Sequence, residues 1–314
     1  MYTLLIDLSN LWMRNAFHKE VRLTSNNPEY SLLKYFVFDQ IYWSIYKLKK
    51  QDLQVDEIIL CCDVKNSWRK IYFPRYKESR QKKRSEDINW DDLFIQLEIL
   101  KKDIKNFIPF KVLSVDRCEA DDIIGTLCLK IPERNFIIIS TDSDFKQLLN
   151  KDNVKLFDPF DKEFVKCDDV NKFLLEIVLT GQTKDDIFNI KTPANYPKEL
   201  RKPGLGEKTV QKILDEGLDK FLDTEMSINK KYIDENGIEQ KYQIKFFPRD
   251  NFKRNQVLID FNLIPEIISN MIIDVYNQYV MPSGNDMYKF FQKQGWKSYL
   301  DNFEVTEKVL SKLN

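Results

Sequence analysis

The sequence predicts an α/β fold with a mostly parallel central sheet flanked by helices, followed by a helical C-terminal lobe. Through residue 180, short apolar runs alternate with longer amphipathic stretches, as in a chain of strands and helices. The apolar runs contain few polar residues, which is typical of parallel strands that helices cover on both faces. After residue 180 such runs nearly vanish and helical patterns follow.

Each element can be assigned from its pattern. The expected strands span residues 3–7, 57–63, 111–115 and 136–140. The expected helices between them span 30–50, 90–107 and 119–130. Later helical patterns lie at 207–215, 265–279 and 287–293. We expect two domains, an α/β domain over 1–180 that carries a basic helical arch at 65–90, and a helical lobe over 181–314.

Composition excludes several classes of protein. The 49 Lys and Arg residues balance 49 Asp and Glu residues, so neither a uniformly basic coat nor an acidic tail is present. With His18 as the one histidine, a multi-histidine zinc site and a histidine-based nucleophilic mechanism are excluded. Five cysteines without a CxxC pair indicate a reducing compartment. Because we find neither a signal peptide nor a membrane span, we expect a cytoplasmic protein without membrane contact.

Acidic side chains follow all four expected strands. Asp7 and Asp63 close the first two, Glu119, Asp121 and Asp122 (EADD) follow the third, Asp142 and Asp144 (TDSD) follow the fourth, and Asp185 lies in a later loop. The carboxyl ends of parallel strands share one edge of the sheet, where ligands bind. We therefore expect seven acids from four segments to converge there, with Asp185 as a candidate eighth.

Such a cluster demands cations. Two carboxylates about 4 Å apart repel by about 4 kcal/mol at an effective dielectric constant of about 20. Oxygen-only ligation selects Mg²⁺ or Mn²⁺, and two such ions promote phosphodiester hydrolysis by water. Each acid alone also has a structural interpretation, since Glu119 and Asp122 complement a helix dipole and Asp142 caps a helix near Ser143. The occurrence of acids after four strands favours the metal site.

Residues 65–84 form a basic segment with nine cations, one acid and a net charge of +8. The cations are Lys65, Arg69, Lys70, Arg75, Lys77, Arg80, Lys82, Lys83 and Arg84, and the aromatic residues between them are Trp68, Tyr72, Phe73 and Tyr76. Phosphate neutralisation with base stacking is typical of a single-strand nucleic-acid grip. Arg69 and Lys77, eight residues apart, are expected to share a helical face towards a phosphate. A solvated basic loop is the alternative interpretation.

A glycine-bounded turn precedes a later helix. Gly204, Leu205 and Gly206 lead into a first helical turn that contains Lys208 and Thr209. Exposed backbone N–H groups at such a helix start bind phosphate oxygens without reading sequence, and Lys202 and Lys208 add positive charge. The alternative is a plain connection between two helices.

Together these segments resemble the 5′-nuclease (flap endonuclease) superfamily, most closely its phage members. The resemblance covers nearly the whole chain and rests on LLIDLSN, CCDVKNSWRKIYFPRYKESR, EADD, STDSDFKQL, GQTKDDI, GLGEKT and VLIDFNLIP. It implies a Mg²⁺-dependent, structure-selective 5′→3′ exonuclease and flap endonuclease with ribonuclease H activity. Such an enzyme removes RNA primers and 5′ flaps during DNA replication and leaves 5′-phosphate products.

The resemblance also implies roles for individual residues. The more tightly bound metal ion would be held by Asp7, Asp63, Asp121 and Asp142, with Glu119 and Asp122 in the same cluster. The second ion would be held by Asp144 and Asp185. We expect that Mn²⁺ can substitute for Mg²⁺. Arg69 and Lys77 match arch residues that polarise the scissile phosphate. Further nucleic-acid contacts are expected at Lys70, Tyr76, Arg80, Lys82, Lys83 and Arg84, and at residues 202–209, which resemble the helix–two-turn–helix element. Gln182 stands where the family commonly has an acid, so we expect weaker binding of the second ion, mostly through waters.

The expected partners are DNA and RNA–DNA duplexes with 5′ ends or flaps. By resemblance they also include a single-strand DNA-binding protein and a sliding clamp, and the protein is expected to be a phage-encoded monomer. Two other functions stay open. A PIN-type nuclease would cleave single-stranded RNA and would not need the turn at 204–209. An inactive architectural DNA binder would keep the arch and the turn, but the intact set of acids argues against it.

Overall fold

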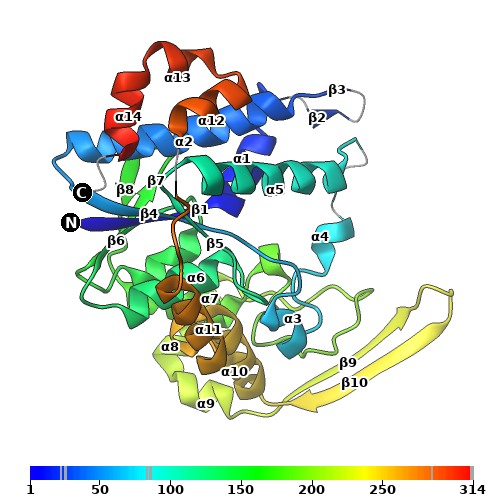
Figure 1. Cartoon of the computed structure of the whole chain (residues 1–314). Coiled ribbons are helices and arrows are strands. Elements are labelled where there is room, and N and C mark those ends of the chain that lie inside the picture. Colours follow the sequence, from blue (N-terminus) through cyan, green and yellow to red (C-terminus); the bar gives the residue numbers. More distant parts are fainter. Residues whose placement is uncertain (22, 25–26, 83, 85–86, 284–285, 312–314) are drawn as a thin grey trace. The chain divides into compact units, whose positions relative to one another are not determined.

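The computed structural model describes residues 1–21, 23–24, 27–82, 84, 87–283 and 286–311 (Figure 1). The chain forms two compact units that interleave along the sequence. Unit 1 contains residues 1–67, 84–168 and 265–314, and unit 2 contains residues 68–83 and 169–264. The domain boundary near residue 180 stays a prediction, and the compact units divide the chain at other places.

Unit 1 is built on a six-stranded sheet with the order β5-β4-β1-β6-β7-β8. Its strands are β1 (Tyr2–Asp7), β4 (Val55–Cys61), β5 (Lys111–Leu113), β6 (Asn135–Ile139), β7 (Val154–Asp158) and β8 (Glu163–Val165). All neighbours pair in parallel except β8, which runs antiparallel to β7. The predicted fold class is confirmed. The second strand ends at Cys61 rather than at Asp63, and the last two strands were not predicted.

Helices cover both faces of this sheet. They are α1 (Leu8–Ala16), α2 (Tyr30–Lys50), α5 (Trp90–Phe107), α6 (Ala120–Lys130), α11 (Glu266–Asn277), α12 (Met287–Gln294), α13 (Lys297–Asp301) and α14 (Phe303–Ser311), with a short 3₁₀ helix η1 (Ser143–Leu148) after β6 and a small hairpin of β2 (Leu23–Thr24) and β3 (Asn27–Pro28). Figure 1 shows α1, α2, α5 and the C-terminal helices on one side, and α6 and α11 on the other. Both layers lie beside the long parallel strands, so these strands are buried on both faces, as their apolar runs predict.

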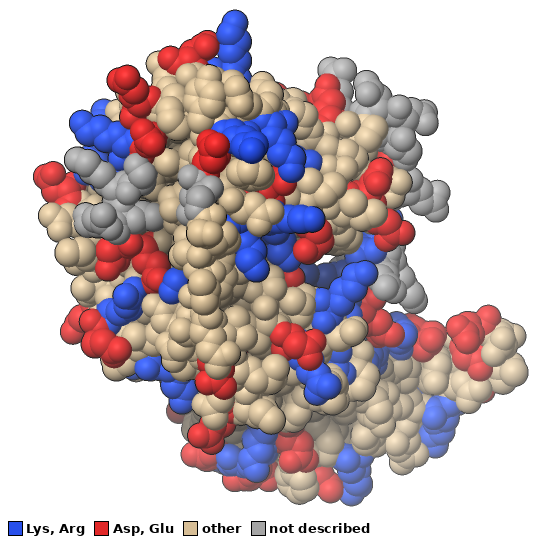
Figure 2. Space-filling view, viewed as in Figure 1, with Lys and Arg blue, Asp and Glu red and all other residues tan. Residues whose placement is uncertain are grey.

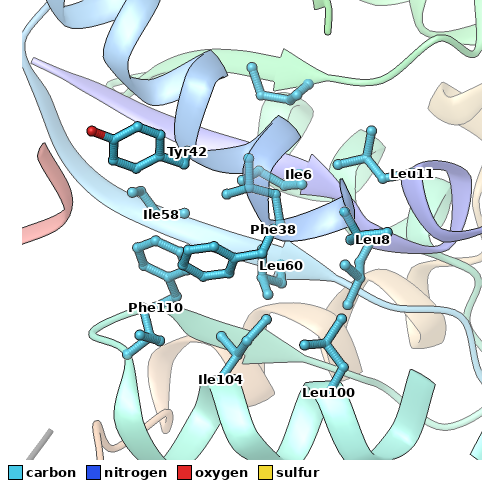
Figure 3. Packing of buried hydrophobic residues seen from close by; sticks show 14 of the residues in the cluster. Ile6, Leu8, Leu11, Phe38, Tyr42, Ile58, Leu60, Leu100, Ile104 and Phe110 are labelled. Atoms are coloured by element: carbon cyan, nitrogen blue, oxygen red, sulfur yellow. The ribbon is translucent and has the colours of Figure 1, made fainter. Parts of the chain in front are cut away.

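The main core lies between the sheet and the layer of α2 and α5. Figure 3 shows Ile6 of β1 and Leu60 of β4 facing Phe38 of α2 and Ile104 of α5, and all four side chains have no exposed surface. Burying one such side chain stabilises the fold by about 2 kcal/mol. The helix α5 begins where Asn89 caps it, with its side chain accepting a hydrogen bond from the Asp92 backbone at 3.1 Å. The core therefore fixes the strand ends from which the acids project.

Unit 2 is mostly helical, as expected, but it also contains a long hairpin. Its elements are α3 (Trp68–Tyr72), α4 (Ser79–Lys82), α7 (Val170–Thr180), η2 (Thr183–Asp185), α8 (Glu207–Glu216), α9 (Leu218–Leu222), β9 (Met226–Ile233), β10 (Glu239–Phe246), α10 (Pro248–Ile259) and η3 (Phe261–Leu263). The hairpin of β9 and β10 corrects the prediction that strands nearly vanish after residue 180. Its strands alternate exposed, mostly polar or charged residues with half-buried ones such as Ile228 and Tyr242, so they contain no continuous apolar run.

The basic segment is not one continuous helical arch. Within the described residues it forms the short helices α3 and α4, joined by turns. Lys83, with the side chain of Lys82, lies outside the described residues.

In the described part of the chain, no helix is both long enough and apolar enough to cross a membrane. Figure 2 shows basic and acidic side chains interspersed over the face in view, as the balanced composition indicates.

Candidate metal centre and basic segment

Two neighbouring strands of unit 1 bring Asp7 and Asp142 to the same hydroxyl group. Asp7 ends β1 and caps α1, and its carboxylate accepts hydrogen bonds from the Asn10 backbone at 2.9 Å and from Ser140 Oγ at 3.1 Å. Ser140 follows β6, and its Oγ also accepts from the Asp142 backbone at 3.1 Å. Because β1 and β6 pair in parallel, their carboxyl ends meet here. Ser140 was not predicted from the sequence, and the parallel register of β1 and β6 is what places it beside Asp7.

Asp63 connects the loop after β4 to the start of α6. Its carboxylate accepts a hydrogen bond from the Ala120 backbone at 2.7 Å, and its own backbone N–H donates to Ser9 Oγ at 3.1 Å. Ala120 is the first residue of α6, so its N–H is one of the donors that a helix leaves without an intrahelical acceptor. Asp63 therefore holds the N-terminus of α6 against the sheet edge, although it lies two residues beyond its strand.

The start of α6 carries the three acids of the EADD run. One ligand oxygen from each of Glu119, Asp121 and Asp122 can be chosen so that all three lie within 4.8 Å of one another. Asp122 is fully buried and its carboxylate accepts from the Glu119 backbone at 2.8 Å, in a reciprocal capping box. This capping box was not predicted, since only a helix-dipole role was expected of this pair, and the same residues with Asp121 form a compact group of three carboxylates.

Electrostatics links Asp7 to the acids beside it. Burial is the main cause that raises the pKa of Asp7 from 3.8 to about 7, and the charges of Asp63 and then Asp142 raise it further. Hydrogen bonds from Asn10 and Ser140 act in the opposite direction. Like charges at close range disfavour ionisation of each carboxyl group. The negative charges at this edge therefore destabilise one another, and a cation placed among them would relieve the repulsion.

Asp144 follows Asp142 on η1. Asp142 caps this helix, and its carboxylate accepts from the Asp144 backbone at 3.0 Å, so the predicted capping role is present as well. The preceding Thr141 donates from its hydroxyl to Asn10 Oδ1 at 2.9 Å, which fixes the TDSD loop to α1. Asn10 is a supporting residue that sequence reasoning missed, and its place three residues after Asp7 is the signal that identifies it. Unit 1 thus groups Glu119, Asp121 and Asp122 in one place and sets Asp63 and Asp142 close enough to act on Asp7, and the convergence of all seven predicted acids stays a prediction.

Asp185 belongs to unit 2, where basic side chains hold it. It is 7% exposed, and its Oδ1 lies 2.6 Å from Arg80 Nη2 and 3.9 Å from Lys77 Nζ. These two cations come from the predicted basic segment. The structure thus pairs an expected metal ligand with expected phosphate-binding residues. The metal role of Asp185 stays a prediction.

Several members of the basic segment are more buried than predicted. Arg69 is 2% exposed, and its Nε donates to the Leu258 carbonyl at 2.9 Å. Tyr76 is 2% exposed and packs with Phe73 in a core cluster of unit 2, which corrects the expectation that its ring stacks on bases. Segment residues at positions 68, 73 and 76 are apolar and anchor these turns to unit 2 by burial.

The remaining cations of the segment differ in exposure. Lys70 on α3 is exposed, as predicted for a contact residue. Arg84 belongs to unit 1 and is exposed, with its guanidinium over the rings of Trp90 at 5.2 Å and Phe94 at 5.3 Å. Such cation–π contacts contribute about 0.5–1 kcal/mol at exposed sites and leave donor groups accessible.

The glycine turn presents its backbone to solvent. Gly206 is the N-cap of α8, and Gly204, Gly206, Lys208 and Thr209 are exposed. Leu205, 9% exposed, anchors the turn in a core cluster with Val210 and Ile213 of α8. Lys202 is exposed and lies 3.8 Å from the ring centroid of Phe188. The turn is thus fixed from one side while the N-terminus of α8 is open to a ligand.

Comparison with known proteins places the chain in a family. A profile described as 5′-3′ exonuclease, N-terminal resolvase-like domain, matches residues 2–174, and one described as T4 RNase H, C terminal, matches residues 172–304. The sheet with its edge of acids lies mainly in the first match, and the glycine turn lies in the second. The chain is therefore a nuclease that belongs to the 5′-3′ exonuclease family.

Individual relatives agree with this assignment. The chain is 29% identical over 277 residues to ribonuclease H of Enterobacteria phage T4, covering 84% of this chain and 83% of that protein. It is 31% identical over 140 residues to the flap endonuclease Xni of Shewanella pealeana, covering 43% of this chain and 50% of the relative.

Solved structures share the fold. A phage T5 protein crystallised with metal ions matches with a TM-score of 0.55 and 18% identity, covering 100% of both chains. The T5 flap endonuclease in a complex with DNA and metal ions matches with a TM-score of 0.53 and 18% identity, covering 100% of this chain and 99% of that chain. At this identity the likeness is one of fold.

Proposed function

We propose that this chain is a Mg²⁺-dependent, structure-selective 5′ nuclease that removes RNA primers and 5′ flaps during DNA replication. It would act as a 5′→3′ exonuclease and flap endonuclease and leave 5′-phosphate ends. The observation that supports the proposal is the group of three carboxylates at the start of α6, together with the charges of Asp63 and Asp142, which help to raise the pKa of Asp7 to about 7. Carboxylates that repel one another in this way need divalent cations.

The donor set fits Mg²⁺. Every candidate ligand at the sheet edge is a carboxylate oxygen, and hard oxygen ligands suit Mg²⁺ and Mn²⁺ better than softer metals. We assign one ion to Asp7, Asp63, Asp121 and Asp142 with Glu119 and Asp122 beside them, and a second ion to Asp144 with waters. When bound, such ions would activate a water molecule and stabilise the leaving oxygen.

The chain's own residues position the nucleic acid. The side chain of Arg80 is 52% exposed, and its guanidinium carries five N–H donors in a planar group that suits a phosphate. Lys77 Nζ lies 3.9 Å from the carboxylate oxygen of Asp185 that Arg80 also contacts. We assign to this pair, with Arg69 as their predicted companion, the role of orienting the phosphate that is cleaved. Contacts by Lys70, Lys82, Lys83 and Arg84 would add affinity through phosphate neutralisation.

The glycine turn is the proposed duplex contact. A Cβ atom built on Gly204 or Gly206 would meet no heavy atom of the protein within 4 Å, and the φ of Gly206 is an ordinary −84°. The fold itself therefore does not require glycine at these positions. A phosphate backbone lying directly against the N-terminus of α8 would require it, because a side chain there would hold the phosphate away from the N–H groups.

Substrates and partners follow by analogy with relatives. The phage T4 relative is a ribonuclease H, the Shewanella relative is a flap endonuclease, and a T5 flap endonuclease was solved with DNA. We propose RNA–DNA and DNA duplexes with 5′ ends or flaps as substrates of this chain. A single-strand DNA-binding protein and a sliding clamp are the proposed protein partners of a phage-encoded monomer.

The test is cleavage of matched substrates labelled at the 5′ end. A 5′-flap duplex, an RNA–DNA hybrid and the corresponding single strands are incubated with Mg²⁺, with Mn²⁺ or with EDTA. We expect Mg²⁺-dependent release of short 5′ oligonucleotides from the flap and the hybrid. Cleavage of single-stranded RNA that ignores the junction would indicate a PIN-type ribonuclease instead, and tight binding without cleavage in any metal would indicate an architectural protein.

A further inference from the structure

One side of α2 in unit 1 combines aromatic with basic residues. Trp43, Tyr46, Lys47 and Lys50 are spaced i, i+3, i+4 and i+7, so they share one side of this helix. Trp43 is 49% exposed, and its ring meets that of Tyr46 edge to face with the ring centroids 5.2 Å apart. Tryptophan is enriched among the residues that dominate binding surfaces, so its exposure marks this side of α2 as a candidate contact.

The turn between β7 and β8 faces this side of α2, and in Figure 1 these strands lie beside the helix. The Asp158 carboxylate accepts hydrogen bonds from the backbones of Phe160 at 2.8 Å and Asp161 at 3.1 Å. The Lys162 backbone N–H donates to the Asp158 carbonyl at 2.8 Å, which closes the turn. Lys47 Nζ donates to the Lys162 carbonyl and joins helix to turn. The two sides are therefore fixed to each other before a ligand binds.

Helix and turn enclose a hollow of about 160 Å³, which we call the α2 pocket. Phe157 and Pro159, both buried, line it together with Trp43 and Tyr46. An engineered protein cavity of about 150 Å³ binds one benzene molecule, whereas drug-sized ligands occupy pockets of about 300–1,000 Å³. The α2 pocket therefore has room for a single aromatic ring and is too small for a whole nucleotide.

The rim of the α2 pocket is positive. Of the described residues that line it, three are lysines and none is acidic. Lys50 and Lys162 are exposed, and Lys50 Nζ lies 4.7 Å from the ring centroid of Tyr46. Burial is the main cause that raises the pKa of Asp39, and the charge of Lys162 acts against it, so this acid compensates part of that charge. Lys47 and Lys50 add positive charge beside the aromatic rings, which favours an acidic ligand.

We propose that the α2 pocket binds a segment of a partner protein in which an aromatic side chain stands between acidic residues. The ring would enter beside Trp43 and Phe157, and the flanking carboxylates would meet the lysines of the rim. A single-stranded nucleic acid also carries rings and negative charge, but the size of the pocket favours one side chain over a nucleotide. The inference goes beyond the proposed function and does not depend on it, because none of these residues is assigned to the metal centre or to nucleic-acid contacts.

The first test is calorimetric titration of the whole chain with two acetylated and amidated pentapeptides, Asp-Asp-Phe-Asp-Asp and Asp-Asp-Ala-Asp-Asp. At about 50 mM salt, where screening is moderate, the peptide with phenylalanine should bind at least about 10-fold more tightly, because only its ring fills the pocket. Equal affinities would overturn the proposal. So would the absence of binding by the phenylalanine peptide up to about 1 mM.

Variants of the chain locate the binding site. Lys50→Glu should weaken the phenylalanine peptide by about 5-fold or more through charge repulsion, and Trp43→Ala should do so through the lost ring contact. Lys102→Glu, at an exposed lysine of α5 in the same unit, is the matched control and should change the affinity by less than about 2-fold. Melting curves report whether each variant is folded, and Lys50→Glu carries the test alone if Trp43→Ala does not fold. Unchanged affinity in every folded variant would overturn the proposal.

A third measurement distinguishes a peptide from a nucleic acid. Lys50→Glu and Trp43→Ala should bind a single-stranded oligonucleotide of about 12 thymidines, and cleave a 5′ flap, within about 2-fold of the unmodified protein. Losses of about 5-fold or more in either quantity would make the pocket a nucleic-acid contact and overturn the proposal. If the unmodified protein cleaves no substrate, the proposed function fails, while the calorimetry still decides whether the α2 pocket binds an acidic peptide.

Discussion

The acid cluster of unit 1 gathers charges of like sign, whereas the basic segment of unit 2 pairs charges of opposite sign. In unit 1, carboxylates from separate strands gather with like charge, and their repulsion with burial raises the pKa of Asp7 to about 7. In unit 2, the acid Asp185 lies between the cations Arg80 and Lys77, so the charges compensate one another within the unit. The charges that act on Asp7 in the first region are of like sign, whereas the second region contains ion pairs between opposite charges.

This difference shows which region sets the requirement for a cofactor. The charges of Asp63 and Asp142 raise the pKa of Asp7, so a cation bound beside these carboxylates would favour their ionised forms and stabilise the folded protein. The paired region gains rigidity from its own charges.

The largest effect should follow removal of one acid from the cluster. Asp142→Asn should lower the rate of flap cleavage by about 1,000-fold or more, because a ligand to the ion is lost. In EDTA it should keep or raise the melting temperature, since it removes one of the charges that disfavour ionisation of Asp7. Thermal melting and a cleavage assay measure both, with Asp161→Asn as an exposed-acid control from the same unit. A large loss of stability in EDTA would show that Asp142 is a structural residue.

Removal of a cation from the basic segment should lower the rate of flap cleavage by less than Asp142→Asn does, and should hardly change the affinity for the duplex. Lys77→Ala should lower kcat by about 100-fold while the affinity for a flap duplex changes by less than about 3-fold, because only one phosphate contact among many is lost. Single-turnover cleavage and fluorescence anisotropy measure the two quantities. Lys172→Ala, at a solvent-exposed lysine of α7, is the control. If affinity fell and turnover did not, Lys77 would be a binding residue.

The pH dependence of stability should differ with and without metal. The pKa of Asp7 is about 7 in the folded protein and 3.8 in the reference state, so the folded state binds the proton more tightly. Protonated Asp7 therefore contributes to the free energy of unfolding at low pH, and this contribution is lost as the pH rises through 7. Between pH 5 and pH 8 in EDTA, we expect a loss of about 2 kcal/mol, or about 5 °C in melting temperature. Adding Mg²⁺ should stabilise the protein more at pH 8 than at pH 5. If the melting temperature of Asp7→Asn in EDTA depends on pH as strongly as that of the unmodified protein, titration of Asp7 is not the cause of the pH dependence.

The smallest effects concern the glycine turn, which neither charge cluster includes. Gly204→Ala and Gly206→Ala should leave the melting temperature within about 2 °C, because a Cβ atom meets no neighbour at either position. Their affinity for a duplex should fall by about 3- to 10-fold if a phosphate lies against the backbone there. Gly181→Ala is the contrasting variant, since the clash with Ile187 should destabilise unit 2 strongly. Unchanged duplex affinity in both alanine variants would exclude the turn as a contact.

Much of unit 1 could be predicted from local pattern. The apolar runs at 3–7, 57–63, 111–115 and 136–140 located four strands, because a strand buried on both faces has few polar residues. The strands β7 and β8 and the hairpin of β9 and β10 were missed. Alternate residues of the hairpin are half-buried, and most of the exposed positions between them are polar or charged, so its signal is a weak period of two rather than an apolar run.

Local pattern alone is enough to predict which acids follow which strands. Because parallel strands place their carboxyl ends together, it also predicts that carboxylates meet at one sheet edge. The folded chain was needed to show that Ser140 bonds both Asp7 and the Asp142 backbone, that Tyr76 belongs to the core, and that Asp185 pairs with Arg80. These contacts join segments far apart in the chain or depend on burial, and local patterns carry no information about either.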